Sequence, residues 1–200
     1  MKNIIIAALL LFLTTSCVET VVVGSLAGVA LVTREKTIKD TGEDIAIAAK
    51  VDKEFLLNGL KGVTNSVGVT VDEGRVLLTG IIRDPDQGRL ALDIVWKIDG
   101  VREVIDEVET SDDGLRTHDF TGTFSDSYLT SIIKLKLFLH PKISPTNYKI
   151  TTFNRVVYLI GVYRSEDDLK EALRLVSTTY GVKKVVNYVI SIHDHRRKSS

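Results

Sequence analysis

Residues 76–80 read VLLTG, and residues 157–161 read VYLIG, 81 positions later. The stretch that follows each copy recurs at the same offset, since residues 100–105 read GVREVI and residues 181–186 read GVKKVV. Neither alignment needs a gap. The shared positions are glycines and strand-type apolar residues, whereas nucleophiles, acids and metal ligands do not cluster in them. The repeat therefore predicts a duplicated binding module rather than an enzyme.

Each copy is predicted to fold as a helix, two strands, a second helix and a third strand. In the first copy, the first helix should turn one side to the core and Lys50, Lys53 and Glu54 to water. The expected inner residues of this helix are Ile45, Ala48, Ala49, Asp52, Phe55 and Leu56. Alternating valines over residues 67–71 and the apolar run 76–82 then predict a hairpin.

Capping residues mark the second helix of each copy. The expected N-caps are Asp84 and Ser165, and the expected helix stops are Gly100 and Gly181. Pro85 occupies the first helical position, and Gln87 is placed to close a capping box. Residues 101–108 and 182–192 follow as the third strands. Because caps agree by chance less easily than hydrophobicity does, this agreement supports a true duplication.

The N-terminal residues have the pattern of an export signal. Lys2 precedes an unbroken apolar run at residues 4–13, and small residues lead to Cys17. Cys17 is the only cysteine, so it cannot form an internal disulfide. A second apolar run, residues 21–32, is too short to cross a hydrocarbon core of about 30 Å, which needs about 20 helical residues. We expect this run to rest on the membrane surface or to pack against a domain.

Charge and catalytic chemistry exclude several functions. The 26 Lys and Arg residues balance 26 Asp and Glu residues, so no general field attracts nucleic acid and we expect no nucleic-acid partner. His193 and His195 lack further metal ligands nearby, and Asp84 and Asp86 suit helix capping better than acid-base chemistry. We therefore expect no catalytic residue, no metal and no cofactor. The basic tail at residues 196–198 should be solvated or weakly attracted to anionic headgroups.

The repeated unit resembles the BON domain. This resemblance rests on the V-x-L-x-G strand end, an alanine inside the second helix (Ala91 and Ala172) and the G-V-x-x-V exit. Two such units behind a lipobox-like sequence at Cys17 resemble the dual BON-domain outer-membrane lipoproteins. The resemblance implies an α+β fold of two tandem BON domains. Each would have the order helix-strand-strand-helix-strand, with a small mixed three-stranded sheet packed on two helices.

The resemblance also implies a division of the chain and a function. The implied segments are a lipoprotein signal peptide (1–16), a lipidated N-terminal segment and linker (17–41), BON domain 1 (42–110), a linker (111–123), BON domain 2 (124–193) and a basic C-terminal tail (194–200). The protein would be non-enzymatic, face the periplasm and be held in the outer membrane by acyl chains on Cys17. It would maintain envelope integrity, with BON domain 2 binding anionic phospholipid and directing localisation to the division site. The alternative is a periplasmic adaptor or chaperone-like module that binds envelope proteins or peptidoglycan.

The two copies differ most in their first helix. In the second copy, residues 126–139 place Leu129, Ile133 and Leu137 toward the sheet and leave further apolar residues on other sides, beside two lysines. The candidate phospholipid-binding residues are Tyr128, Ile132, Lys134, Leu135 and Phe138. The resemblance adds that Tyr128 matches an aromatic residue that the family uses for lipid contact. The alternative is that this side packs against the first copy, with Trp96 as a possible partner.

Overall fold

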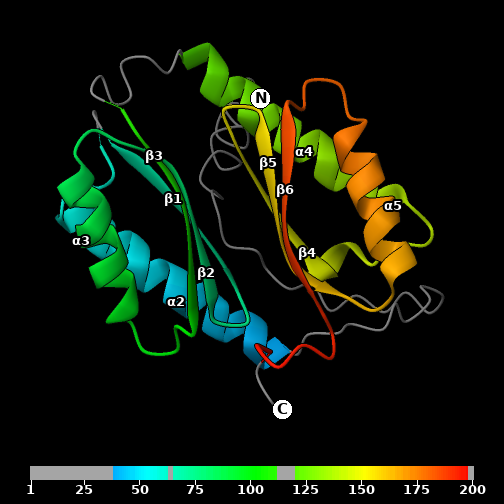
Figure 1. Ribbon diagram of the computed structural model, residues 1–200, viewed down its shortest axis with the longest axis horizontal. Helices are drawn as coiled ribbons and strands as arrows, with labels where there is room; N and C mark the ends of the chain where they lie inside the picture. Colours follow the sequence, from blue (N-terminus) through cyan, green and yellow to red (C-terminus); the bar gives the residue numbers. More distant parts are fainter. Residues whose placement is uncertain (1–37, 63–64, 112–119, 198–200) are drawn as a thin grey trace, which may run out of the picture. The chain divides into compact units, whose positions relative to one another are not determined.

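The computed structural model describes residues 38–62, 65–111 and 120–197 of the chain (Figure 1). The predicted signal peptide, Cys17, the apolar run at residues 21–32 and most of the linker between the copies lie outside these residues. The described residues form two modules, each with two helices and a mixed three-stranded sheet. The predicted α+β class and the tandem arrangement are therefore confirmed.

The two modules have the same order of elements and the same strand pairing. The first contains α2 (Ile38–Leu57), β1 (Ser66–Asp72), β2 (Arg75–Ile82), α3 (Pro85–Trp96) and β3 (Glu103–Thr110). The second contains α4 (Phe120–Leu139), the 3₁₀ turn η2 (Pro145–Asn147), β4 (Tyr148–Phe153), β5 (Val156–Tyr163), α5 (Glu166–Ser177) and β6 (Lys184–Ser191). In each sheet the middle strand pairs antiparallel with the strand before it and parallel with the last strand. The two copies of the sequence repeat therefore have the same strand pairing.

Element ends differ from the prediction at several points. Residues 38–41 and 120–123, expected in linkers, belong to α2 and α4. The second helices end before the glycines expected to stop them, because Lys97 and Thr178 cap α3 and α5. Gly100 and Gly181 therefore lie beyond the helix caps, and the third strands begin two residues later than expected.

The predicted N-caps are confirmed, but the predicted capping box is not formed. Asp84 accepts a hydrogen bond from the amide of Asp86 at 2.9 Å, and Ser165 accepts one from the amide of Asp168 at 3.2 Å. The side-chain oxygen of Gln87 is buried without a hydrogen-bond partner, so it does not reach back to the start of the helix. The aspartate alone supplies the cap at α3.

The inner side of α2 differs from the predicted one. The buried side chains of α2 are Asp44, Ile47, Val51 and Phe55. Ile45 and Leu56, expected inside, are 64% and 67% exposed. The prediction was wrong because it took exposed apolar residues for the inner side, whereas the buried residues Ile47, Val51 and Phe55 repeat every four residues and Asp44 continues their side of the helix. The first copy therefore also exposes apolar residues on its first helix.

A carboxylate from the first helix holds the hairpin turn in each module. Asp44 accepts hydrogen bonds from the amides of Glu73 and Gly74, both at 3.0 Å. Asp126 accepts equivalent bonds from the two amides of residues 154–155, at 2.7 and 2.8 Å. Such charge-assisted hydrogen bonds are stronger than neutral ones. Each aspartate therefore links the first helix of its module to the turn between the first two strands.

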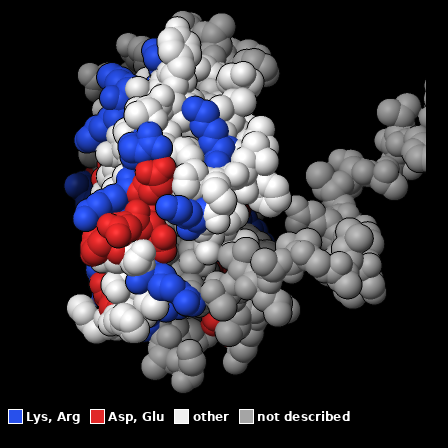
Figure 2. All heavy atoms as spheres, turned by 90° about the vertical axis from the view of Figure 1, so that its right-hand side faces the viewer, with Lys and Arg blue, Asp and Glu red and all other residues white. Residues whose placement is uncertain are grey.

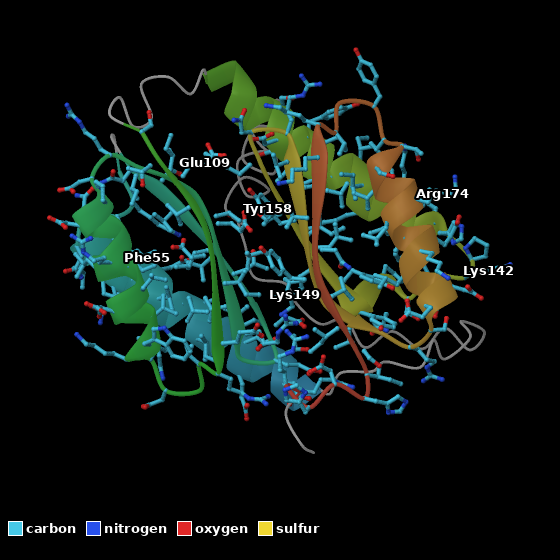
Figure 3. All side chains as sticks on the ribbon, viewed as in Figure 1. Phe55, Glu109, Lys142, Lys149, Tyr158 and Arg174 are labelled. Carbon is cyan, nitrogen blue, oxygen red and sulfur yellow. The ribbon has the colours of Figure 1, made fainter. Side chains whose placement is uncertain are left out.

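The two sheets face each other, and the helices cover their outer faces (Figure 1). The residues that fill the space between the sheets include Leu77, Ile105, Tyr158 and Ile160. Figure 3 shows Tyr158 between the two sheets. Alternate residues of the middle strands pack against the helices, so every residue of β2 is buried. Burial of both faces explains why the middle strands are mostly apolar rather than alternating between apolar and polar residues.

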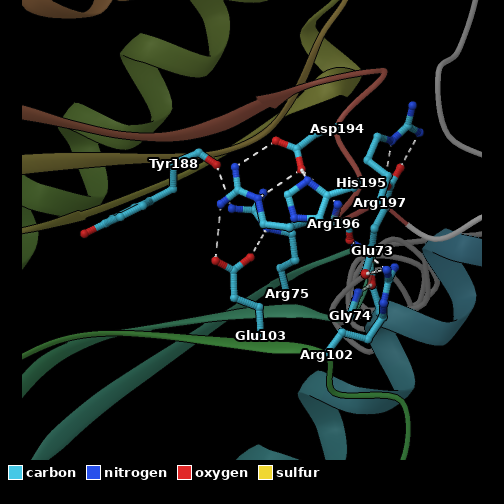
Figure 4. A network of polar contacts seen from close by, with 11 residues as sticks. Glu73, Gly74, Arg75, Arg102, Glu103, Tyr188, Asp194, His195, Arg196 and Arg197 are labelled. Carbon is cyan, nitrogen blue, oxygen red and sulfur yellow. Dashed lines mark hydrogen bonds and ion pairs between the residues drawn. The ribbon is translucent and has the colours of Figure 1, made fainter.

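Polar contacts also join the two modules. The guanidinium of buried Arg75 donates to Glu103 at 2.5 Å and to the backbone carbonyl of Tyr188 at 3.0 Å (Figure 4). The Tyr188 hydroxyl donates to Glu107. Burial and the hydrogen bond to Glu107 raise the pKa of Tyr188 to about 12, so this hydroxyl keeps its proton even at an alkaline pH at which an ordinary tyrosine ionises. A cross-module hydrogen bond is thereby preserved.

The C-terminal arginines contact the first module rather than solvent alone. Arg197 donates to both carboxylate oxygens of Glu73, at 2.9 and 2.6 Å (Figure 4). Arg102 donates to the backbone carbonyl of Arg196 at 2.7 Å. The expectation of a simply solvated tail was therefore wrong for Arg196 and Arg197, because Glu73 at the hairpin turn offers a carboxylate that is almost fully buried. The tail adds to the joint between the modules.

Candidate membrane-contact surface

Helix α4 is fixed to the second module by one side. Leu129, Ile133 and Leu137 are 4%, 0% and 1% exposed and pack in the core against the sheet, as the four-residue spacing predicts. The hydroxyl of Thr130 donates to that of Thr152 on β4 at 2.7 Å. The outer side of α4 is thus free to serve another purpose.

The outer side of α4 carries a row of large exposed apolar side chains, here called the α4 patch. It comprises Tyr128 (63% exposed), Leu135 (52%), Phe138 (70%) and Leu139 (69%), with half-buried Ile132 beside them. Leu139 was not among the predicted residues, although it lies four residues after Leu135 and seven after Ile132, which is the spacing of one helix face. The structure therefore brings together the predicted apolar residues and adds one.

The α4 patch does not pack against the first module. Its four large members are more than half exposed, and the first module contacts the second mainly through its sheet and through Asp44 of α2. Trp96, considered as a partner for the patch, is 55% exposed on α3. The alternative in which the outer side of α4 is covered by the first module is therefore excluded.

A lysine borders the α4 patch on each side. Lys136 donates to the hydroxyl of Thr179, which follows α5, at 3.1 Å. Lys134 is exposed on the other side, toward β4, and forms no ion pair within residues 38–62, 65–111 and 120–197. Apolar side chains with flanking lysines are typical of helices that lie at an anionic membrane surface.

The end of α4 is joined to α5 by charged side chains. The ring nitrogen Nε2 of His140 lies 3.2 Å from a carboxylate oxygen of Glu171. Arg174 donates two hydrogen bonds to the same carboxylate, at 2.8 and 2.6 Å, and this contact lowers the pKa of Glu171 to about 2. Glu171 thus stays ionised at an acidic pH at which an ordinary glutamate is protonated, and it holds the residue directly after α4 near α5.

Formal charge divides unequally between the modules. Residues 42–110 contain eight Lys and Arg against fourteen Asp and Glu, whereas residues 124–193 contain ten against five. This asymmetry was not predicted, because the charges of the whole chain sum to zero. On the face formed by α5, most acidic side chains lie in one cluster with Lys and Arg around it, in keeping with the acidic first turn of α5 (Figure 2). An anionic surface should therefore attract the second module and repel the first.

The structure gives little support to other site chemistry within its described residues. There, no three His, Cys, Asp or Glu side chains are placed to hold a metal ion. Between the candidate ligands His193 and His195, Asp194 is engaged by Arg196 at 3.0 and 2.9 Å. No helix among the described elements is both long and apolar enough to span a bilayer.

Comparison with known proteins identifies the repeated unit. The family model of the BON domain matches twice, at residues 43–112 and 125–191. This chain belongs to the BON-domain family. The first and second modules are thus BON domain 1 and BON domain 2, each with the helix-strand-strand-helix-strand order that the resemblance implied. The α4 patch is on BON domain 2.

Several known proteins are similar to this chain over most of its length. A protein from the gshII 5′ region of Anaplasma centrale is 33% identical over 156 residues, which is 78% of this chain and 99% of the relative. The outer membrane lipoprotein DolP of Haemophilus influenzae is 26% identical over 85% of this chain and 86% of its own. The osmotically-inducible protein Y of Escherichia coli is 28% identical over 72% of this chain and 71% of its own. The predicted resemblance to dual BON-domain proteins of the DolP type is confirmed.

Proposed function

We propose that this protein is a non-enzymatic lipoprotein of the bacterial outer membrane in which BON domain 2 binds anionic phospholipid through the α4 patch. The exposure of Tyr128, Leu135, Phe138 and Leu139 on one side of a helix whose other side is buried carries the proposal. The excess of basic residues in BON domain 2 supports it, as does similarity to a relative named as an outer membrane lipoprotein. Cys17 is the proposed site of lipidation.

Energetics assign the anchor and the α4 patch different tasks. Acyl chains contribute about 0.8 kcal/mol for each buried CH₂ group, so chains on Cys17 would hold the protein at the membrane. Two or three partly inserted side chains of the patch contribute a few kcal/mol at most, and a nearby lysine adds about 1 kcal/mol at an anionic surface. The patch is therefore not needed for attachment. Its task is to orient the tethered protein and to select among lipids.

Vesicle flotation tests the lipid contact. With Cys17→Ser in the chain to remove acylation, we expect stronger binding to phosphatidylglycerol vesicles than to phosphatidylcholine vesicles, and weaker binding at high salt. Phe138→Asp should reduce binding to the anionic vesicles about tenfold or more, because it removes about 1.4 kcal/mol or more of apolar burial and adds a repelled charge.

Trp96→Asp is the matched control for flotation, since Trp96 is also an exposed aromatic residue but lies on α3 of BON domain 1. This variant should bind anionic vesicles as the parent chain does. Equal losses in both variants, or no preference for anionic vesicles, would contradict the proposal. An adaptor that uses the α4 patch for a protein or peptidoglycan partner would show no vesicle binding.

We also propose that the α4 patch directs the protein to the division site, and the position of the protein in cells tests this role. In the acylated protein, Tyr128→Glu should abolish enrichment at the division site without releasing the protein into the soluble fraction, because Cys17 remains the anchor. Fluorescence microscopy of a tagged protein and membrane fractionation measure the two properties separately. Enrichment that persists in the variant would remove the directing role, and release into the soluble fraction would contradict the assigned anchor.

A further inference from the structure

A groove of about 350 Å³ runs along the line where BON domain 1 meets BON domain 2. Residues of α2 and β1 form one wall, and residues of α4 and β4 form the other. The apolar lining includes Ala48 and Val69 from BON domain 1 and Ile150 from BON domain 2. Its size lies within the range of about 300–1,000 Å³ that is usual for small-ligand sites. Neither domain alone could form this groove.

Two lysines lie in the groove, and they differ in their contacts. Lys149 is held by the carboxylate of Asp44 at 2.8 Å and by the backbone carbonyl of Val71. Figure 3 shows Lys149 between the two domains. Lys134 lies on the wall formed by α4 and, within the described residues, forms no ion pair. Lys134 is therefore the cation that an incoming anion would meet.

The groove opens beside the α4 patch. Phe138 of the patch lies four residues after Lys134, one turn along the same side of α4, and is 70% exposed. Across the groove, Ile45 of α2 is 64% exposed although it is a large apolar residue. Lys134 thus has an exposed apolar side chain of α4 beside it and another, on α2, across the groove. This arrangement complements an amphiphile with an anionic head and an apolar tail.

We propose that this groove binds one anionic phospholipid molecule, with its phosphate at Lys134 and an acyl chain against Ile45, Ala48 and Val69. The inference rests on the proposed function, since lipid reaches the groove from the membrane that the α4 patch contacts. It assigns BON domain 1, whose overall charge is acidic, a local apolar contact with lipid. It also assigns a purpose to the cross-domain pair of Lys149 and Asp44, which holds the two walls of the groove together.

Nuclear magnetic resonance with a soluble lipid tests the groove. The full chain carrying Cys17→Ser is titrated with dihexanoyl phosphatidylglycerol below the concentration at which that lipid forms micelles. We expect the amide signals of Ala48, Val69 and Ile150 to shift together. Ile45→Asp should weaken binding about tenfold or more, and Lys134→Ala should weaken it several-fold.

Leu57→Asp is the matched control, because Leu57 is 68% exposed on the same helix but does not line the groove. This variant should bind the soluble lipid as the parent chain does. Equal weakening by Ile45→Asp and Leu57→Asp would overturn the inference, as would shifts confined to the α4 patch. Equal shifts with glycerol 3-phosphate, which has no acyl chain, would also overturn it.

Vesicle flotation separates the two proposals. If anionic vesicles bind through Phe138 but the groove signals do not shift, the groove inference fails and the proposed function stands. If the vesicles do not bind, the proposed function fails, and the inference that rests on it fails as well.

Discussion

Gly161→Ala is expected to unfold BON domain 2. A Cβ atom at Gly161 would lie 2.0 Å from the backbone carbonyl oxygen of Asn147, and the residue has a φ of +155°. Because that oxygen belongs to the backbone beside the adjoining strand, it cannot move without breaking the hairpin. We expect a loss of more than about 4 kcal/mol, which is a large part of the stability of a small domain.

Chemical denaturation followed by circular dichroism measures this loss. Gly80→Ala should destabilise BON domain 1 in the same way, since its Cβ would lie 1.9 Å from the carbonyl oxygen of Ser66 at a φ of +127°. Gly42→Ala is the control, because Gly42 lies in α2 and a Cβ atom added there would meet nothing within 4 Å. That change should be neutral or stabilise the protein by up to about 1 kcal/mol. A Gly161→Ala variant as stable as the Gly42→Ala variant would disprove this account of the repeated glycine.

Asp126→Ala should destabilise BON domain 2 by about 2–3 kcal/mol. The buried carboxylate accepts two backbone hydrogen bonds from the turn between β4 and β5, and hydrogen bonds to a charged group contribute about 1.5–3 kcal/mol each when the donors are shielded. The donors here belong to exposed turn residues 154–155, so in the alanine variant water can form hydrogen bonds with these amides and reduce the loss of stability. Both of these residues have positive φ, which makes the turn depend on its partner.

The midpoint of thermal unfolding measures the effect of Asp126→Ala. Asp126→Asn, which keeps one acceptor oxygen, should lose less stability than the alanine variant. Asp44→Ala should cost more than Asp126→Ala, because Asp44 also pairs with Lys149 of the other domain. Identical stability of Asp126→Ala and the parent chain would show that the turn holds its conformation without the carboxylate.

The successful predictions depend on interactions that are local in sequence. Asp84 and Ser165 cap their helices through amides two or three residues away, so the cap is visible in the sequence. The buried side of α4 was predicted correctly because Leu129, Ile133 and Leu137 repeat every four residues. The residues of the α4 patch followed as the remaining apolar positions of that helix.

The failed predictions depend on contacts between distant segments. Asp44 is buried because it binds a turn 29 residues away and a lysine of the other domain, whereas the apolar residue that follows it in the sequence was assigned to the inner side of α2. Ile45 was consequently expected in the core rather than beside a groove. Arg197 was expected in solvent because its partner, Glu73, lies 124 residues away. No local pattern indicates such pairs.

The amino-acid sequence alone determines the duplication, the order of the elements and the side of α4 that is buried, because backbone conformation and amphipathic spacing act over a few residues. Only the tertiary structure shows that the two sheets face each other, since an apolar strand reveals that both of its faces are buried but not what covers them. This packing leaves the outer side of α4 uncovered and forms the groove between the domains. Because the two copies pack together through their sheets, the outer side of α4 stays exposed and forms the proposed membrane surface.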